Sequence, residues 1–469
     1  MTGGFLLRDA ELPDGRRADL RVRDGRIADI APSVPWEAGE EVVECGGGAL
    51  LPGLVDHHLH LHALAAARRS VRCGPPDVAD RAGLAAALAA AVPDRHGWVR
   101  GTGYHESVAG DLTSAALDAL DARRPVRVQH RSGAMWMLNT PAARAVRLDE
   151  ADHPGIERDS AGAPTGRIWR ADAWLRSRLP SAAPPDLADV GRELARLGVT
   201  AVTDATPELT PEALASIASA RRDGTLPQHV HLLGAPLDPS NDEGLWTPGP
   251  WKIVLADSGL PAFDDLAERI GTAHAAGRPV AVHAVTREAL VLLLAALREA
   301  GAVPGDRIEH AALVPPELTG EIAALGAAVV TQPGFLADRG DDYARDVPAD
   351  DRPDLYRCGS LAAAGVRVAL SSDAPYGPLD PWAVIAAAVR RETPDGRVLN
   401  PAERLSPRAA LDAYLAPPDD PGGPPRRLRT GGPADLVLLR HGLDAALAEP
   451  GADAVRLTAA NQIIYQSSG

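Results

Sequence analysis

The stretch Leu51-Pro52-Gly53-Leu54-Val55-Asp56-His57-His58-Leu59-His60 contains the pattern that decides the fold. Side chains alternate along a strand, so Asp56, His58 and His60 are predicted to share one side. A His-x-His pair at the end of a strand can present two nitrogen atoms to one metal ion. The alternative is a chance histidine cluster on a solvated loop. The apolar run before the pair favours metal ligands, whereas His57 and His62 are interpreted as outer or surface residues.

Outward from this stretch, short strand-like segments alternate with helix-like segments. The predicted strands are residues 50–55, 199–203, 229–233, 252–256, 280–283, 307–311, 328–332 and 367–371, and the clearest helices are 263–276, 287–300, 316–325 and 380–391. The last helix has Asp380 as its N-cap and Pro381 at its first position. Eight strands alternating with helices predict an α/β fold, a TIM-like (β/α)8 barrel.

The two ends of the chain carry short strands of another kind. Residues 5–7, 18–22 and 26–30 at the start, and 434–439, 454–458 and 462–465 at the end, are strand-like and separated by turns. A few short strands are marginally stable alone. We therefore expect residues 1–50 and 426–469 to form one composite β-sandwich beside a barrel domain over 51–425.

Residues from about 63 to 180 are too many for one crossover, and we interpret them as an insertion after the first barrel strand. Catalytic groups of such barrels lie at the carboxyl ends of the strands, so an insertion there is expected to form a lid or pocket wall. The residues predicted to bind substrate, from position and chemistry alone, are Tyr104, Arg131, Trp136 and Arg287. The alternative for the aromatic residues is the insertion's own core.

Three further side chains end later strand segments. His283 ends 278–283, His310 ends 307–310 and Asp373 ends 368–373. Either histidine alone would more often be structural, but two on consecutive strands beside a His-x-His strand predict a shared metal site. A buried carboxylate is unfavourable without a cation. Asp373 is therefore predicted to bind the metal and to act as the catalytic base.

Lys252 opens the apolar segment 251–255. A lysine inside a barrel is destabilising unless it is paired or modified. A carbamylated Lys252 would be an anion able to bridge two metals, and an ordinary lysine reaching for water is an equal alternative.

Composition narrows the class of partner. The formal net charge is −15, from 48 basic against 63 acidic residues. This balance argues against nucleic acid and anionic membranes as partners. No apolar run is long enough to span a membrane or to resemble a signal peptide, and the three cysteines lack metal-binding spacing. We expect a cytoplasmic protein that acts on a small molecule. A homodimer is one possible assembly.

Several motifs resemble the amidohydrolase superfamily, and within it the amidohydrolase-3, or YtcJ-like, branch. They are Pro52-Gly53-Leu54-Val55-Asp56 with His58 and His60, Val282-His283-Ala284, Arg307-Ile308-Glu309-His310-Ala311, Ser372-Asp373-Ala374-Pro375, Trp98-Val99-Arg100-Gly101-Thr102-Gly103-Tyr104, Pro164-Thr165-Gly166 and Gly198-Val199-Thr200. The resemblance covers nearly the whole chain. It implies a metal-bearing barrel flanked by a two-part β-sandwich. The implied metal ligands are His58, His60, His283, His310 and Asp373. Lys252 matches the lysine that precedes the Ala-Asp-Gly motif of the branch.

Two positions depart from that branch. Ser132-Gly133-Ala134 stands before Asn139-Thr140 where the branch usually has Asp-Gly-His, so a histidine expected near the substrate is missing. Ala256-Asp257-Ser258-Gly259 departs from the usual Ala-Asp-Gly. Both departures bear on the substrate and leave the predicted metal site intact.

The function expected from these residues is hydrolysis of an amide-like C–N bond, in an N-acyl, N-formyl or cyclic amide, by water activated on one or two divalent ions, with zinc preferred. The alternatives are non-hydrolytic chemistry on the same site, such as decarboxylation or isomerisation, and a catalytically silent metal-binding protein. A Ser-His-Asp hydrolase is disfavoured because the chain lacks a Gly-x-Ser-x-Gly elbow.

Overall fold

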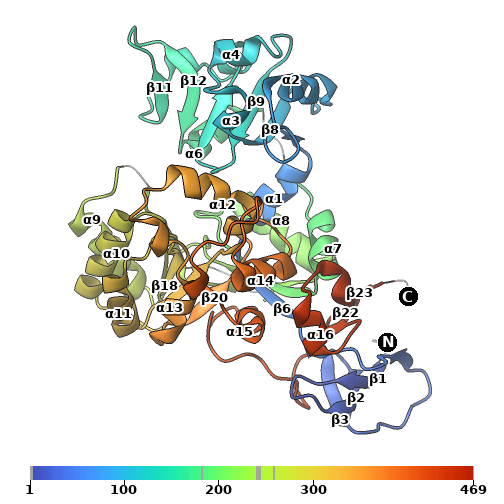
Figure 1. Cartoon of the computed structure of the whole chain (residues 1–469). Helices are drawn as coiled ribbons and strands as arrows, with labels where there is room; N and C mark the ends of the chain where they lie inside the picture. Colours follow the sequence, from blue (N-terminus) through green and yellow to red (C-terminus); the bar gives the residue numbers. More distant parts are fainter. Residues whose placement is uncertain (1–3, 181–182, 239–243, 257–258, 468–469) are drawn as a thin grey trace. The chain divides into compact units, whose positions relative to one another are not determined.

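The structure, a computed structural model, describes residues 4–180, 183–238, 244–256 and 259–467. The chain divides into two compact units (Figure 1). Unit 1 comprises Met1–His62 and Asp186–Gly469, and unit 2 comprises Ala63–Pro185. Helix α1 (Leu61–Arg68) contains the boundary. Each unit has its own hydrophobic clusters, and none of the described helices is long and apolar enough to cross a membrane.

Two parallel sheets form the centre of unit 1. The first has the order β15-β14-β13-β6 and the second β16-β17-β18-β19-β20. Their strands are β6 (Leu54–Leu59), β13 (Val199–Asp204), β14 (His229–Leu232), β15 (Thr247–Pro248), β16 (Trp251–Val254), β17 (Val280–Ala284), β18 (Arg307–His310), β19 (Ala328–Thr331) and β20 (Val368–Leu370). Two backbone hydrogen bonds link the sheets: Lys252 N of β16 donates to Leu233 O, next to β14, at 3.1 Å, and Asp373 N, beyond β20, donates to His58 O of β6 at 2.8 Å.

Helices connect these parallel strands, because a parallel pair needs a crossover. They are α7 (Ala188–Arg196), α8 (Pro211–Arg222), α9 (Phe263–Ala275), α10 (Arg287–Ala300), α11 (Pro316–Leu325), α12 (Gly334–Asp346), α13 (Cys358–Ala363) and α14 (Pro381–Arg390). The predictions for 287–300 and 316–325 are confirmed to the residue, and Asp380 caps α14 as predicted, accepting from Trp382 N.

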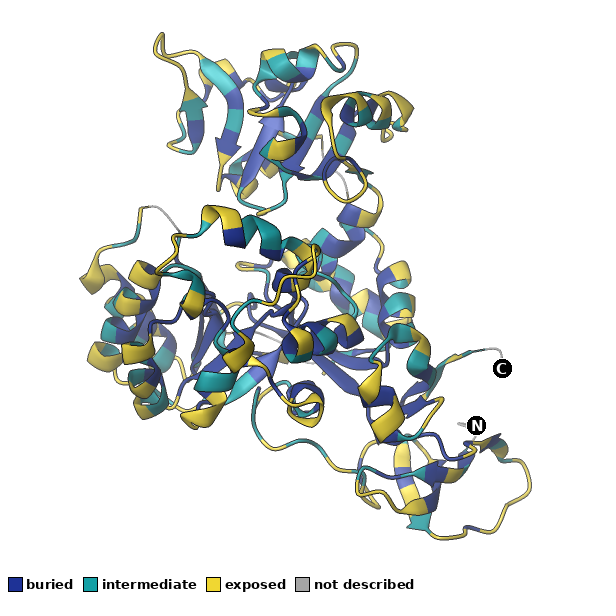
Figure 2. Ribbon diagram, in the orientation of Figure 1, coloured by how far each residue is buried: buried dark blue, intermediate teal, exposed yellow. Residues whose placement is uncertain are grey.

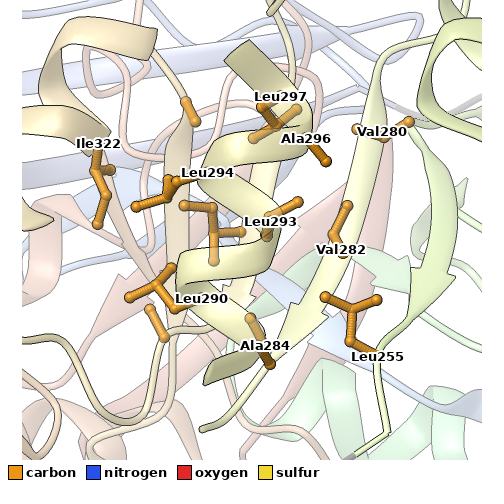
Figure 3. Close-up of a cluster of buried hydrophobic side chains, with 14 of the residues drawn as sticks. Leu255, Val280, Val282, Ala284, Leu290, Leu293, Leu294, Ala296, Leu297 and Ile322 are labelled. Atoms are coloured by element: carbon orange, nitrogen blue, oxygen red, sulfur yellow. The ribbon is translucent and has the colours of Figure 1, made fainter. Parts of the chain in front are cut away.

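The packing of α10 shows why the helices cover the sheet. Leu290, Leu293, Leu294 and Leu297 recur at helical spacing and are all buried (Figure 3). They form one cluster with Val280 and Val282 of β17. These two valines lie on the face of the strand that is turned towards α10, because side chains alternate between the two faces of a strand. Figure 2 shows buried residues concentrated on the strands and exposed residues on the outer faces of helices.

Two smaller sheets complete unit 1. One has the order β3-β2-β1-β4, from β1 (Phe5–Glu11), β2 (Arg17–Arg23), β3 (Arg26–Ala31) and β4 (Glu41–Glu44). The other has the order β23-β22-β21-β5, from β5 (Leu50–Pro52), β21 (Asp435–Leu439), β22 (Val455–Ala460) and β23 (Gln462–Gln466), with α15 (Pro407–Asp412) and α16 (Leu443–Ala448) nearby in sequence. Both sheets contribute to one buried cluster, which includes Leu7, Leu20, Leu436 and Leu457.

The predicted strand 50–55 is wrong in one respect. The structure divides it at Gly53 into β5, which pairs with β21, and β6, which pairs with β13. A Cβ atom at Gly53 would lie 2.2 Å from the Thr200 side chain, so the close approach requires glycine. The second part also runs on to Leu59, which places His58 inside the strand.

Unit 2 contains a six-stranded sheet of order β11-β12-β10-β9-β8-β7. Its elements are β7 (Val71–Arg72), α2 (Arg81–Ala90), β8 (Val99–Tyr104), α3 (Glu106–Ala109), α4 (Ser114–Asp118), β9 (Val126–His130), β10 (Met135–Leu138), α5 (Thr140–Ala145), β11 (Ile156–Arg158), β12 (Pro164–Trp169) and α6 (Asp172–Arg178). Two buried clusters stabilise it, one around Leu84 and Val128 and one around Trp136 and Ile168.

Candidate metal centre

Three of the predicted ligands form a compact group. The ligand atoms of His58, His60 and Asp373 all lie within 4.8 Å of one another. Oδ1 of Asp373 lies 3.6 Å from His58 Nε2 and 3.3 Å from His60 Nε2. The structure thus brings together a strand near the start of the chain and a loop far along it.

Local backbone structure explains how these side chains converge. His58 lies in β6 and His60 follows it directly, so both face the same side of the strand. Asp373 follows β20 and has a φ of 52°, in the left-handed region that non-glycine residues adopt rarely. Its backbone N–H bonds to His58 O at 2.8 Å, and His60 N bonds to Ala374 O at 2.9 Å. These bonds hold the loop after β20 against the end of β6.

His310 and His283 extend the group. The ring of His310 lies 4.8 Å from that of His58, and the ring of His283 lies 4.4 Å from that of His310, centre to centre. His310 Nδ1 is 3.9 Å from Asp373 Oδ2. Both residues stand at the carboxyl ends of neighbouring strands, β18 and β17, as the sequence predicts.

Lys252 is the second residue of β16, which begins one residue earlier than the predicted strand. Its side chain is 5% exposed, and its Nζ has no hydrogen-bond partner among the described residues. Burial lowers the pKa of Lys252 to about 8, and the nearby carboxylates of Glu309 and Asp373 oppose that shift. The alternative of a lysine reaching for water is wrong, because the side chain is enclosed.

Each of three imidazoles has a partner on its Nδ1 atom. His58 Nδ1 contacts Glu309 Oε2, His60 Nδ1 lies 3.2 Å from Thr206 Oγ1, and His310 Nδ1 lies 2.8 Å from Gln332 Oε1. A histidine that binds a metal through Nε2 is usually oriented by such a contact on Nδ1. For His58 and His60, the opposite nitrogen is the one that faces Asp373.

Glu309 is a functional residue whose role sequence reasoning missed. It is fully buried, and its carboxylate also accepts hydrogen bonds from Arg307 Nε and, at 3.0 Å, Arg307 Nη2. Arg307 in turn donates to His57 O at 2.7 Å. The available signal was the spacing of Arg307 and Glu309 by two along the strand, because that spacing places both side chains on one face.

Burial lowers the pKa of the His58, His283 and His310 imidazoles, which favours their neutral forms. Burial, followed by the charge of Lys252, lowers the pKa of His58 to about 3, and burial lowers that of His283 well below its ordinary value. Burial acts to raise the pKa of Asp373, but His60, His58 and His310 outweigh it, so the carboxyl stays ionised. Neutral imidazoles and an ionised carboxylate are the protonation states that metal binding requires.

The donor set fits a divalent cation. Despite its contacts with two imidazoles, Asp373 Oδ1 has no neighbour in hydrogen-bonding geometry among the described residues. A buried carboxylate is unfavourable without a charged partner, and a cation between Asp373 and the imidazole nitrogens would interact favourably with both. Nitrogen and carboxylate ligands in this combination are those that zinc prefers.

The predicted substrate residues are divided between the two units of the chain. Tyr104, Arg131 and Trp136 belong to unit 2. Tyr104 OH donates to Gly110 O, and Trp136 Nε1 donates to Asp172 Oδ1 at 2.8 Å. In unit 1, Arg287 is half-exposed and pairs with Asp351 and Asp354. Substrate contact by these four residues stays a prediction.

The structure describes the first of the two departures from the branch, at residues 132–134, and only part of the second, at residues 256–259. Ser132 lies in the turn between β9 and β10 of unit 2, where its Oγ is 2.7 Å from His130 Nδ1. In the second departure, Asp257 and Ser258 lie outside the described residues.

Comparisons with known proteins extend this picture. The sequence profile described as "Amidohydrolase family" matches residues 41–462. The N-substituted formamide deformylase of Arthrobacter pascens is 26% identical over 91% of each chain, and the putative amidohydrolase YtcJ of Bacillus subtilis (strain 168) is 24% identical over 80% of each. An uncharacterised metal-dependent hydrolase from Pyrococcus horikoshii OT3 matches with a TM-score of 0.74 and 21% identity, over 94% of this chain and 98% of that one. This likeness shows a TIM-barrel-type fold of mixed α/β content.

Proposed function

Because this chain belongs to the amidohydrolase family, we propose that it is a metal-dependent hydrolase that cleaves an amide-like C–N bond. The single observation that carries the proposal is the convergence of His58, His60 and Asp373 within 4.8 Å. The formamide deformylase of Arthrobacter pascens supports a C–N bond as the target and N-formyl compounds as the first substrates to test.

The ligand roles are assigned from the contacts. His58, His60 and Asp373 would hold one ion. His283 and His310, which extend this group, would be further ligands. Bound there, a divalent ion, with zinc preferred, supplies Lewis acidity and lowers the pKa of water from about 15.7 to about 7. If Lys252 becomes carbamylated, its new carboxylate would complete the site for a second ion.

Side chains of the protein then transfer the proton of the attacking water. Asp373 Oδ1 accepts the proton of the attacking water and passes it to the leaving nitrogen. The water oxygen bonds to the acyl carbon as the C–N bond breaks, giving a carboxylic acid and an amine. Glu309 and Gln332 keep His58 and His310 in one orientation throughout. A closed (β/α)8 barrel, formed by the two parallel sheets, and a composite β-sandwich at the termini are the architecture we propose to hold these groups.

Metal content and turnover test the proposal together. Purified protein is analysed for bound metals and assayed, with zinc, manganese and cobalt, on N-formyl amines, N-acyl amino acids and cyclic amides, with products identified by NMR. We expect bound metal and hydrolysis of at least one class. The double variant H58A/H60A should lose both, whereas H441A, at an exposed histidine, should retain both. Metal without hydrolysis would count against the enzymatic role, and other products would favour decarboxylation or isomerisation.

A further inference from the structure

A mostly buried arginine with an incomplete set of partners lies beside the candidate metal centre. Arg339 is on α12, which follows β19, and its side chain is 12% exposed. The helix departs from helical geometry at this residue, where φ is −141° and ψ is 22°. The guanidinium lies 4.3 Å from the centre of the Phe335 ring, which covers one of its faces.

Two contacts connect Arg339 to the metal ligands. Its Nη2 donates to Tyr376 O, and Tyr376 N donates to Asp373 O at 2.9 Å. The Tyr376 ring in turn lies 5.5 Å from the ring of His60. Tyr376 thus connects Arg339 to the imidazole of His60 and to the backbone carbonyl of Asp373.

The protein uses only part of the hydrogen-bonding capacity of Arg339. Its carboxylate partner is Asp338, which is 46% exposed and makes a single contact of 3.3 Å. No partner is recorded for Nη1 within the described parts of the chain. Arg391 shows the contrast: it is fully buried and donates to three backbone carbonyls, those of Leu399, Tyr356 and Leu355.

A guanidinium with an N–H edge that no described residue uses suits a planar anion that accepts two parallel N–H bonds. Resting on the proposed hydrolysis, we propose that Arg339 binds the carboxylate of the substrate, which is therefore an N-formyl or short N-acyl α-amino acid. A neutral N-substituted formamide would leave this guanidinium without its partner. The substrate of this protein would therefore carry a carboxylate, which an N-substituted formamide without an acidic group lacks.

Paired substrates test the role of Arg339. N-formyl amino acids with aromatic, aliphatic and acidic side chains are each assayed beside the matching carboxamide, which differs only in the charged group. We expect the wild type to prefer the carboxylate, and R339Q to reduce that preference in kcat/KM by about 10- to 100-fold, mainly through KM, as is typical for a lost charge-assisted bond. R339K should restore part of it. R345Q, on the same helix but exposed and paired with Asp342, is the matched control.

Two results would overturn the inference. One is a wild-type enzyme that hydrolyses carboxamides as well as carboxylates. The other is an R339Q variant that loses activity equally on both, since Arg339 would then serve only to hold the Tyr376 loop.

A binding measurement separates this inference from the proposed hydrolysis. Calorimetry with metal-free protein and the same N-formyl amino acids needs no turnover. Binding that R339Q abolishes and R345Q retains, in a protein that hydrolyses nothing, would support the carboxylate site and reject the hydrolase. Absence of binding to the wild type in both the metal-free and metal-loaded forms would reject the carboxylate site.

Discussion

The imidazole of His58 and the carboxylate of Glu309 form a buried hydrogen bond between β6 and β18, and Arg307 binds the same carboxylate. The carboxylate fixes which nitrogen of His58 faces Asp373. Substitution E309Q removes the charge and weakens this control, so we expect metal affinity to fall by about 10- to 100-fold. Competition with a chelator measures the affinity directly. E317Q, at an exposed glutamate of α11, is the control, and an unchanged affinity in E309Q would reject the role.

Asp373 carries two assigned roles, which the substitution D373N separates. Asparagine keeps an oxygen near the imidazoles but cannot accept a proton. We expect metal to remain bound through the histidines while kcat falls by about 10²- to 10⁴-fold, the range for loss of a general base. Metal analysis and steady-state kinetics on one preparation give both values. Activity close to that of the wild type refutes the base assignment.

Leu293 tests the packing that positions β17 and β18. Its side chain is fully buried in the cluster of Figure 3. L293A leaves a cavity, so the free energy of unfolding should fall by about 2–5 kcal/mol. Val291 is two residues away and 48% exposed, so V291A should change it by less than about 0.5 kcal/mol. Urea unfolding of both variants measures the difference, and equal effects would contradict the assigned packing.

Glu106 gives unit 2 a dependence on pH. A hydrogen bond from His130, at 3.1 Å, lowers the pKa of Glu106 to about 2 from an ordinary value of 4.5. A lowered pKa contributes stability that is complete above 4.5 and is lost as the pH falls towards 2. E106Q should therefore be less stable than the wild type at pH 7, with a clearly smaller gap at pH 3 that closes only near pH 2. Urea unfolding at pH 7, 5 and 3 checks this.

The matched control for that experiment is E150Q, because the Glu150 side chain is 69% exposed. Its stability should follow that of the wild type at each pH. A gap between E106Q and the wild type that stays constant from pH 7 to pH 3 would show that the ionised form of Glu106 is not what stabilises the fold.

Removal of metal provides a test of ligation without turnover. An ion that binds only the folded state raises its stability by RT ln(1 + [L]/Kd), about 2.7 kcal/mol at one hundred times Kd. Chelation should lower the Tm of the wild type, and added zinc should restore it. The H58A/H60A variant should show no such response. A wild-type Tm that changes neither on chelation nor on addition of zinc would mean that these side chains bind no ion.

The sequence predicts the helices of unit 1 well because their apolar positions recur at helical spacing. Helices α10 and α11 match to the residue for this reason. The gathering of His58, His283, His310 and Asp373 was also predictable, since each stands at or just beyond the carboxyl end of a short strand. A parallel arrangement of strands then brings such ends to one edge.

Other features depend on partners distant in the chain. The contact of Glu309 with His58 spans 251 positions, and no local pattern specifies it. The break at Gly53 follows from the approach of Thr200, and the enclosure of Lys252 from elements around it. Similarly, the sheet of unit 2 pairs strands whose order follows from tertiary packing rather than from alternation along each segment.

The hydrogen bond from Ser372 N to Asp56 Oδ1, at 3.1 Å, joins residues 316 positions apart at the point where the ligands meet. During synthesis, the ribosome therefore releases His58 and His60 long before the carboxylate that completes their site. The nascent chain has to collapse around β20 before it can trap an ion. If the proposed function holds, acquisition of the cation is a late event of biogenesis, and chains that stall before residue 373 should leave the ribosome without it.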